Sequence, residues 1–278
     1  MADFKIDTDL IAAADGTYGR VLSQAWEIWG PNGGYVAALA LRTAGLHCQR
    51  PRPANATVHF LGVANFEDPV VITPTTLRQT RNATSVAVSM TQLGKPILHA
   101  LVWAIDDDLP GLSHDEAPMP DVPMWNTLPT VQERFAASGI DAPIRFRFWE
   151  NFDQRPPTWI DDWDNRVLGA PLYHNWMRFN STSDTTDRWL HAARLLTLVD
   201  LGGYPAVGLR HNTESFVAPS LDVSCEFHHL NPSDDWHLLQ GISPVAADGL
   251  IGSHQSVWND VGQLVASGVS HLFCRPVR

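Results

Sequence analysis

Two stretches of the chain are apolar around most of a helical circumference, and four strand-like runs follow each of them. The first stretch spans residues 35–45, after a Gly-Pro-Asn-Gly-Gly break at residues 30–34. It has too few polar positions for a surface helix, so we expect it to be buried on most sides. The second stretch spans residues 187–200 and stops before Gly202 and Gly203, which can close a helix.

The runs between these helices are rich in β-branched and aromatic residues, and Gly, Pro, Asn and Asp separate them. After the first helix the predicted strands are residues 56–63, 69–80, 83–92 and 96–105; after the second they are 220–229, 236–245, 249–259 and 263–275. Further strands are predicted ahead of the helices, at 19–29, 144–148 and 171–179. Such short connections favour antiparallel meanders.

Each half thus contains a strand, a buried helix and four strands, for which internal duplication is the best account. We predict an α+β double hotdog, with two tandem antiparallel sheets that each wrap around a long apolar helix and can continue into one another. The expected domains are residues 1–108, a Pro-rich linker at 109–142 with a short helix at 131–138, and residues 143–278. Two unrelated α+β domains are the alternative.

Composition narrows the class of protein. Hydrophobic residues make up 44% and charged residues 18% of 278 residues, as in a soluble globular protein. A net charge of −11 argues against nucleic acid or an anionic membrane as a partner. No apolar run approaches the ~20 residues of a membrane span, and neither a signal peptide nor a disulfide pattern is evident, so we expect a cytoplasmic protein.

Asp200 stands where two local rules disfavour a carboxylate. It continues the helix face of Trp189, Ala193 and Leu196, and it lies in the last turn, where the helix dipole opposes an anion. Such violations are typical of functional positions, although an exposed or Arg-paired aspartate is the alternative. Burial would raise its proton affinity and suit a general base. Ser220 opens the next long strand, where its hydroxyl could orient a water or be an ordinary strand serine.

A second candidate is the glycine-rich start of the first helix. Free amides at Gly33 and Gly34 could stabilise an oxyanion, and with Tyr35 they form our predicted substrate-binding set. The alternative is that the glycines only permit a tight turn and close packing. The first half has no carboxylate at the equivalent end of its helix, residues 41–45, which predicts one working site.

Other kinds of site are not supported by the pattern. His228 and His229 point to opposite faces of a strand, His237 completes no zinc spacing, and no carboxylate completes a ligand set, so we expect no metal. There is no GxSxG elbow or GxGxxG loop. The arginines could form a phosphate-binding patch or a solvated rim; they are Arg42, Arg50, Arg52, Arg78 and Arg81.

The sequence resembles the type II acyl-CoA thioesterase family over nearly its whole length. The matching segments are WGPNGGYVAALALRTA (residues 29–44), TVHFL (57–61), SLDVSCEFH (220–228), WHLL (236–239) and GQLVAS (262–267). The resemblance implies a double hotdog, usually paired into a dimer, that hydrolyses acyl-CoA to free fatty acid and coenzyme A without a cofactor.

The same resemblance implies three site residues: an Asp late in the second helix, a Thr or Ser on the next strand, and a Gln on the last strand. Asp200 and Ser220 match, but Ser270 occupies the position of the glutamine. The leading hypothesis is therefore thioester hydrolysis by a water that Asp200 and Ser220 hold. The alternative is an acyl-CoA or acyl-ligand binding protein with little or no catalysis. Hydratase chemistry lacks the Asp and His that it needs beside either helix.

Overall fold

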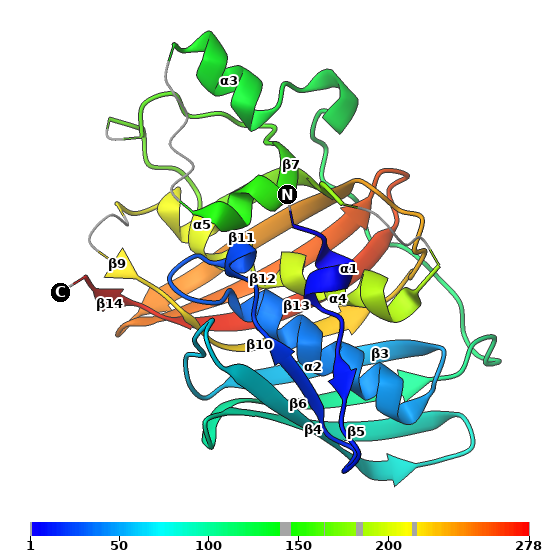
Figure 1. The fold of residues 1–278 in the computed structure, drawn as a ribbon. Helices are drawn as coiled ribbons and strands as arrows, with labels where there is room; N and C mark the ends of the chain where they lie inside the picture. The colour runs from blue at the N-terminus through cyan, green and yellow to red at the C-terminus, as the bar shows by residue number, and fades with distance from the viewer. Residues whose placement is uncertain (1, 140–145, 164, 182–185, 213–215, 278) are drawn as a thin grey trace.

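One continuous antiparallel sheet forms the body of the molecule. The computed structural model describes residues 2–139, 146–163, 165–181, 186–212 and 216–277, and within them the sheet has twelve strands (Figure 1). In their order across the sheet they are β1 (Ile11–Ala12), β2 (Tyr18–Val21), β4 (Pro69–Gln79), β5 (Ala83–Gln92), β6 (Lys95–Ile105), β3 (Arg52–Phe60), β10 (Ser220–Phe227), β13 (Leu264–Phe273), β12 (Leu250–Asn259), β11 (His237–Ala247), β8 (Leu172–Phe179) and β7 (Phe152–Arg155).

The order of the strands confirms the predicted double hotdog. Read outward from the centre, one half runs β3-β6-β5-β4-β2 and the other β10-β13-β12-β11-β8, which is the same sequence of equivalent strands. The halves join where β3 and β10 pair, with Val58 opposite Val223. Because each half lends an edge strand to the other, neither central edge is left unpaired.

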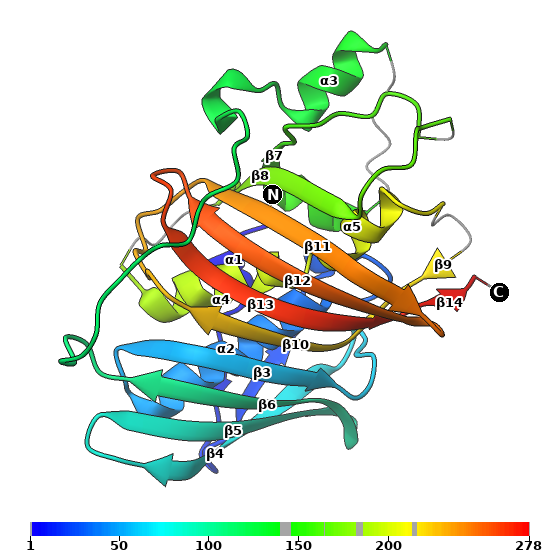
Figure 2. The same cartoon turned by 180° about the vertical axis from the view of Figure 1, so that it is seen from behind.

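Two long helices, α2 (Gly33–Cys48) and α4 (Arg188–Val199), lie side by side on one face of the sheet (Figure 1). Small residues let them approach closely: a Cβ atom on Gly34 would lie 2.8 Å from Thr197 Cα, and one on Gly45 would lie 2.5 Å from the Trp189 ring. The two helices share a single hydrophobic core that draws on both halves. Seen from behind, the strands cover them (Figure 2).

Shorter elements complete the fold. They are α1 (Phe4–Asp7), the 3-10 helices η1 (Gln24–Trp26), η2 (Trp125–Thr127) and η3 (Arg147–Asn151), α3 (Val131–Ala137), α5 (Gly203–Gly208), and a pair of two-residue strands, β9 (Phe216–Val217) and β14 (Arg275–Pro276). The helix predicted at residues 131–138 is thus confirmed as α3, and the eight strands predicted after the helices are all present.

The strand predicted over residues 19–29 is wrong beyond Val21. Ser23 accepts a hydrogen bond from the Ala25 amide and starts η1, which turns Trp26 into the core. There Trp26 packs edge-on against Phe4 of α1 and stacks on Tyr35. This aromatic packing outweighs the strand preference of the local sequence. Residues 144 and 145 of the strand predicted at 144–148 lie outside the described residues, and from Arg147 the chain forms η3.

The Pro-rich segment packs on the outer face of the second half instead of only crossing the surface. Trp125 stacks on Trp236 with ring centroids 4.7 Å apart, and the Pro123 carbonyl accepts a hydrogen bond from Trp176 Nε1. Met119, Val122, Met124 and Leu128 extend the same cluster. The segment therefore covers apolar side chains that the strands β8, β11 and β12 would otherwise expose.

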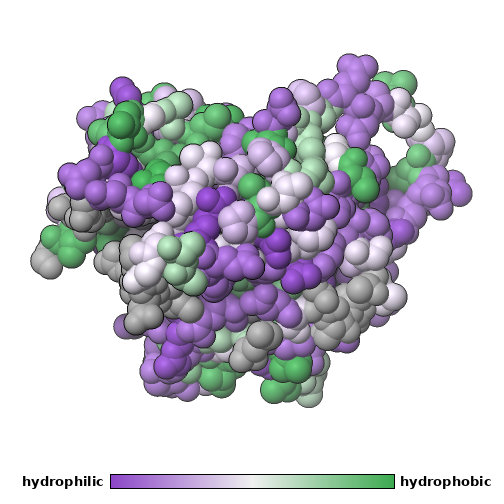
Figure 3. All heavy atoms as spheres, turned by 90° about the horizontal axis from the view of Figure 1, so that it is seen from above, coloured by the Kyte–Doolittle hydropathy of each residue, from purple (hydrophilic) through white to green (hydrophobic). Residues whose placement is uncertain are grey.

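The face of the molecule that carries α3 is mainly polar at its centre. Viewed from the side of α3, hydrophilic side chains cover most of the middle of the molecule and hydrophobic ones gather chiefly toward its edges (Figure 3). Within the described ranges, every helix is too short or too polar to cross a bilayer.

Candidate active site

A cavity of about 330 Å³ opens where α2, α4, α5 and β10 meet. Its volume is within the usual range for small-molecule sites. Most of the wall is apolar and comes from both halves, with Trp29, Val36, Phe60, Ile97, Trp149, Leu201, Tyr204 and Leu272 among its residues. Asp200 and Ser220 lie in this wall with Gly33. Polar groups are therefore concentrated at one place in an apolar pocket.

Asp200 is the residue that closes α4, and its carboxylate receives two hydrogen bonds. Oδ1 accepts from the Ser220 hydroxyl at 2.8 Å, and Oδ2 accepts from the Gly34 amide at 2.7 Å. Gly34 belongs to the first turn of α2, where free N–H groups and the helix dipole favour an anion. The carboxylate that the dipole of its own helix disfavours is thus held by the N-terminus of the neighbouring helix.

The surroundings of Asp200 hold its proton tightly. Although the side chain retains some exposure to the cavity, protein atoms crowd it, and this desolvation raises its pKa from 3.8 to about 7. The hydrogen bonds from Ser220 and Gly34 act in the opposite direction because they favour the charged form. The balance leaves a carboxylate that can both accept and return a proton near neutral pH.

A β-bulge turns Ser220 toward this carboxylate. Val223, Cys225 and Phe227 of β10 point into the core, so strict alternation would place Leu221 inside and Ser220 outside. The register against β13 shifts between Ser220 and Asp222, and Leu221 is 41% exposed. The extra residue reverses the facing of Ser220 and brings its hydroxyl to Asp200.

Gly33 and Gly34 serve different purposes at the start of α2. A Cβ atom on Gly33 would lie 2.9 Å from Asp200 Oδ2 and 3.0 Å from Phe60 Cζ, so only glycine leaves room for the carboxylate. In the described part of the chain the Gly33 amide donates to no protein group. The Gly34 amide is already bound to Asp200, while its missing side chain allows the contact with Thr197. Gly33 therefore leaves room for the Asp200 carboxylate, and Gly34 allows the close packing of α2 against α4.

Models of two acyl-CoA thioesterase domains match the chain. The N-terminal domain matches residues 22–105 and the C-terminal domain matches residues 115–271. The chain belongs to the acyl-CoA thioesterase family. The second match includes Asp200 and Ser220 and ends at His271, and the first includes both glycines at the start of α2.

Solved structures share the fold over nearly the full length. The acyl-CoA thioesterase II TesB2 from Mycobacterium marinum superposes with a TM-score of 0.78 at 21% identity, over 99% of this chain and 98% of that one. A conserved hot dog protein from Alicyclobacillus acidocaldarius gives 0.79 at 21% identity with the same coverage. The tesB protein of Mycobacterium avium subs paratuberculosis gives 0.75 at 18% identity, over 98% of each chain.

Two of the predicted site residues lie away from the cavity beside Asp200. Tyr35 is completely buried on the other side of α2, where its ring stacks on Trp26 and its hydroxyl donates to the Asp7 carbonyl at 2.9 Å. It therefore positions the helix rather than lining the cavity. Ser270 is 1% exposed, and its hydroxyl is bonded to Ser253 Oγ at 2.8 Å. Among the described contacts, Ser270 has none with Asp200 or Ser220.

A glutamine does lie beside Ser270, but on the neighbouring strand. Gln255 of β12 donates from Nε2 to Ser253 Oγ at 2.7 Å and to Ser270 Oγ at 3.4 Å. It is 2% exposed, and its Cγ would be 2.9 Å from a Cβ atom on Gly202, two residues after Asp200. His271, the residue after Ser270, cannot take the role of the glutamine that the family resemblance implies. Its side chain points to the outer face of the sheet and pairs with Asp222 at 3.1 Å. Comparison of the β13 sequence with the family pattern could not have found Gln255, because Gln255 lies on β12.

Three of the arginines considered for phosphate binding are bound within the protein. Arg50 pairs with Asp106 at 2.7 Å, Arg52 pairs with Asp107 at 3.4 Å, and Arg42 donates to Thr8 Oγ1 and the Lys5 carbonyl. These contacts hold segments of the first half together. They argue against a phosphate-binding patch made of these three arginines.

Proposed function

We propose that this chain hydrolyses an acyl-CoA thioester to a free carboxylic acid and coenzyme A. The observation that carries the proposal is the Asp200 carboxylate, which lies in the wall of an apolar cavity with Ser220 and Gly34 bound to it. The apolar wall suits an acyl chain, and the family supplies acyl-CoA as the class of substrate.

In the proposed reaction Asp200 removes a proton from a water that Ser220 helps to orient. The water oxygen bonds to the thioester carbonyl carbon, and the carbonyl oxygen becomes an oxyanion near the Gly33 amide, which has no protein acceptor among the described residues. The carbon–sulfur bond then breaks. Coenzyme A leaves as a thiolate and takes the proton from Asp200, which restores the carboxylate.

The proposal is tested by measuring thiol release from acyl-CoAs of increasing chain length. Asp200→Asn should lower kcat by about 10²–10⁴, the usual contribution of a general base. Asp222→Asn is the matched control, because Asp222 lies on β10, two residues after Ser220, but faces outward toward His271; we expect near wild-type rates. No thiol release by folded wild type, or equal rates for wild type and Asp200→Asn, would refute hydrolysis. Acyl-CoA binding without Asp200-dependent turnover would instead support a binding protein.

A further inference from the structure

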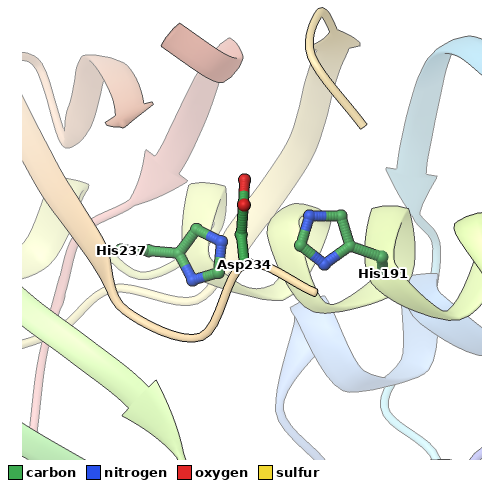
Figure 4. A group of neighbouring side chains, drawn as sticks. All are labelled: His191, Asp234 and His237. Carbon is green, nitrogen blue, oxygen red and sulfur yellow. The ribbon is translucent and has the colours of Figure 1, made fainter. Parts of the chain in front are cut away.

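Two buried histidines and an aspartate converge outside the thioesterase cavity. His191 lies on α4, His237 is the first residue of β11, and Asp234 lies in the turn before it. One ligand atom from each lies within 4.8 Å of the other two. In Figure 4 the Asp234 side chain stands between the two imidazole rings. Because His191 and His237 are far apart in sequence, the group has no short motif that sequence analysis could detect.

Neither imidazole ring has a hydrogen-bond partner in the described part of the structure. His191 is 0% exposed and His237 is 2% exposed, and all four of their ring nitrogens are buried without a partner. The ring centroids are 5.5 Å apart. A buried polar atom without a partner costs about 1–3 kcal/mol, and a ligand between the rings would bind one nitrogen of each ring.

From this geometry we infer that His191, Asp234 and His237 bind a divalent transition-metal ion, with Zn²⁺ the best fit. Two imidazole nitrogens and one carboxylate oxygen are a common zinc ligand set, completed by a water. Zinc bonds of about 2.1 Å place donor atoms about 3.4 Å apart, so the side chains must close by at most about 1.4 Å from their 4.8 Å limit.

Neighbouring side chains already orient the carboxylate. Asp234 accepts hydrogen bonds from Asn231 Nδ2 at 2.7 Å and from Asn259 Nδ2 at 3.0 Å. Such outer contacts fix ligand orientation in metal sites. Asp234 is only half-buried, so an ion can reach the group from solvent on this side.

The electrostatics of the group are mixed but compatible with a cation. Arg194 is 4% exposed and acts electrostatically on both imidazole rings. The Arg194 charge opposes a cation, and the Asp234 carboxylate offsets that charge.

The site is independent of the thioester chemistry and can be tested without an activity assay. Tag-free protein is stripped with a chelator and titrated with Co²⁺, whose visible d–d absorption reports ordered ligation. Wild type should give absorption that saturates at one equivalent and is displaced by Zn²⁺. Zn²⁺ should also raise the Tm, because an ion that binds only the folded chain stabilises it.

Variants separate this site from the other histidines. Asp234→Asn, which removes a half-buried ligand and leaves both rings in place, and His237→Gln should each weaken Co²⁺ binding by at least about 10-fold to 100-fold. His271→Gln is the control, because His271 forms an exposed pair with Asp222 and should not affect binding. Circular dichroism checks that each variant folds.

The inference fails if wild type shows no saturable cobalt absorption, or if Asp234→Asn and His237→Gln bind Co²⁺ as wild type does. A high-resolution crystal structure, grown with Zn²⁺, that shows only a water between the rings would also overturn it. Loss of thioesterase activity alone would not bear on it, because Asp200 and Ser220 lie outside the group.

Discussion

At the scale of single residues, Asp200 is poised between two protonation states. Its raised pKa of about 7 means that the charged, proton-accepting form predominates only above neutral pH. We therefore expect kcat/KM to rise with pH through about 7 and then level off, since the free enzyme needs the ionised carboxylate. A pH–rate profile with a short, soluble acyl-CoA measures this. A flat profile from pH 5 to 8 would contradict the role of Asp200 as base.

Ser220 stabilises the charged form of Asp200, and its removal should move the same profile. Ser220→Ala removes a hydrogen bond that lowers the pKa of Asp200. The acid limb of kcat/KM should shift to higher pH, and the plateau should fall by up to about 100-fold because the water is less well placed. Ser224→Ala is a suitable control: Ser224 lies on β10 with Ser220, but its hydroxyl donates to Thr57 Oγ1 of β3 at 3.1 Å. An unshifted limb in Ser220→Ala would show that the serine does not act on the carboxylate.

The same carboxylate should reduce stability at neutral and alkaline pH. The folded pKa of Asp200 is raised above the unfolded value, so the folded state holds its proton between pH 3.8 and about 7 while the unfolded state releases it. Its contribution to the free energy of unfolding therefore declines as pH rises through this window. Asp200→Asn should be more stable than wild type at pH 8, by up to about 4 kcal/mol at 1.4 kcal/mol per pKa unit.

That advantage should shrink steadily as the pH is lowered from 7 toward 4, and it should be constant above about pH 8. Urea denaturation of both proteins at three pH values measures it. A stability difference that does not change with pH would mean that Asp200 is not desolvated as described.

Residue-scale prediction from sequence succeeded where one helix or one strand carried the signal. The unfavourable position of Asp200 was visible in the face of its own helix, and the family resemblance added Ser220. The bulge at Leu221 that turns Ser220 inward was not visible, because a register shift depends on the partner strand. Gln255 and the His191 group were missed for the same reason: their neighbours come from other elements.

At the scale of elements, α2 contributes to the candidate site at its start and packs against α4 along its length. Substitutions of two of its glycines distinguish these two roles. Gly33→Ala would push a Cβ atom against Asp200 Oδ2 and Phe60. We expect kcat to fall by about 100-fold, the cost of a displacement near 1 Å, with little change in Tm. Gly45→Ala would instead press on Trp189 at the far end of α2. It should destabilise the fold by about 1–3 kcal/mol and leave kcat almost unchanged.

Gly19→Ala provides the neutral reference, because its Cβ atom would make only an ordinary contact at 3.7 Å. Steady-state kinetics and thermal melts of the three variants give the comparison. Equal losses of activity in Gly33→Ala and Gly45→Ala would mean that the start of α2 has no special role in the site.

The elements that sequence predicted well are those whose burial alternates. Along β4 the exposed and buried positions alternate from Pro69 to Pro74, and its ends were found to within one residue. The strand expected at residues 19–29 failed because Trp26 packs against Phe4 and Phe148, which are distant in sequence. The Pro-rich segment looked like a bare linker since its apolar residues lack a regular period, although they cover Trp176 and Trp236.

At the scale of the whole molecule, the site exists only where the halves meet. Asp200 and Ser220 come from the second half, while Gly33 and Gly34 come from the first. The two halves share one core, and the β3–β10 pairing makes their sheets continuous. We therefore expect the chain to unfold as a single cooperative unit despite its internal duplication.

Urea titrations test this cooperativity. Tryptophan fluorescence, far-UV circular dichroism and thiol release should give coincident transitions. We expect this because neither half can unfold without exposing the core that it shares with the other half. Gly45→Ala weakens the contact between α2 and α4 and should move all three transitions together to lower urea. A transition that splits in this variant, with secondary structure lost in two steps, would show that each half folds independently and that the shared core contributes little to its stability.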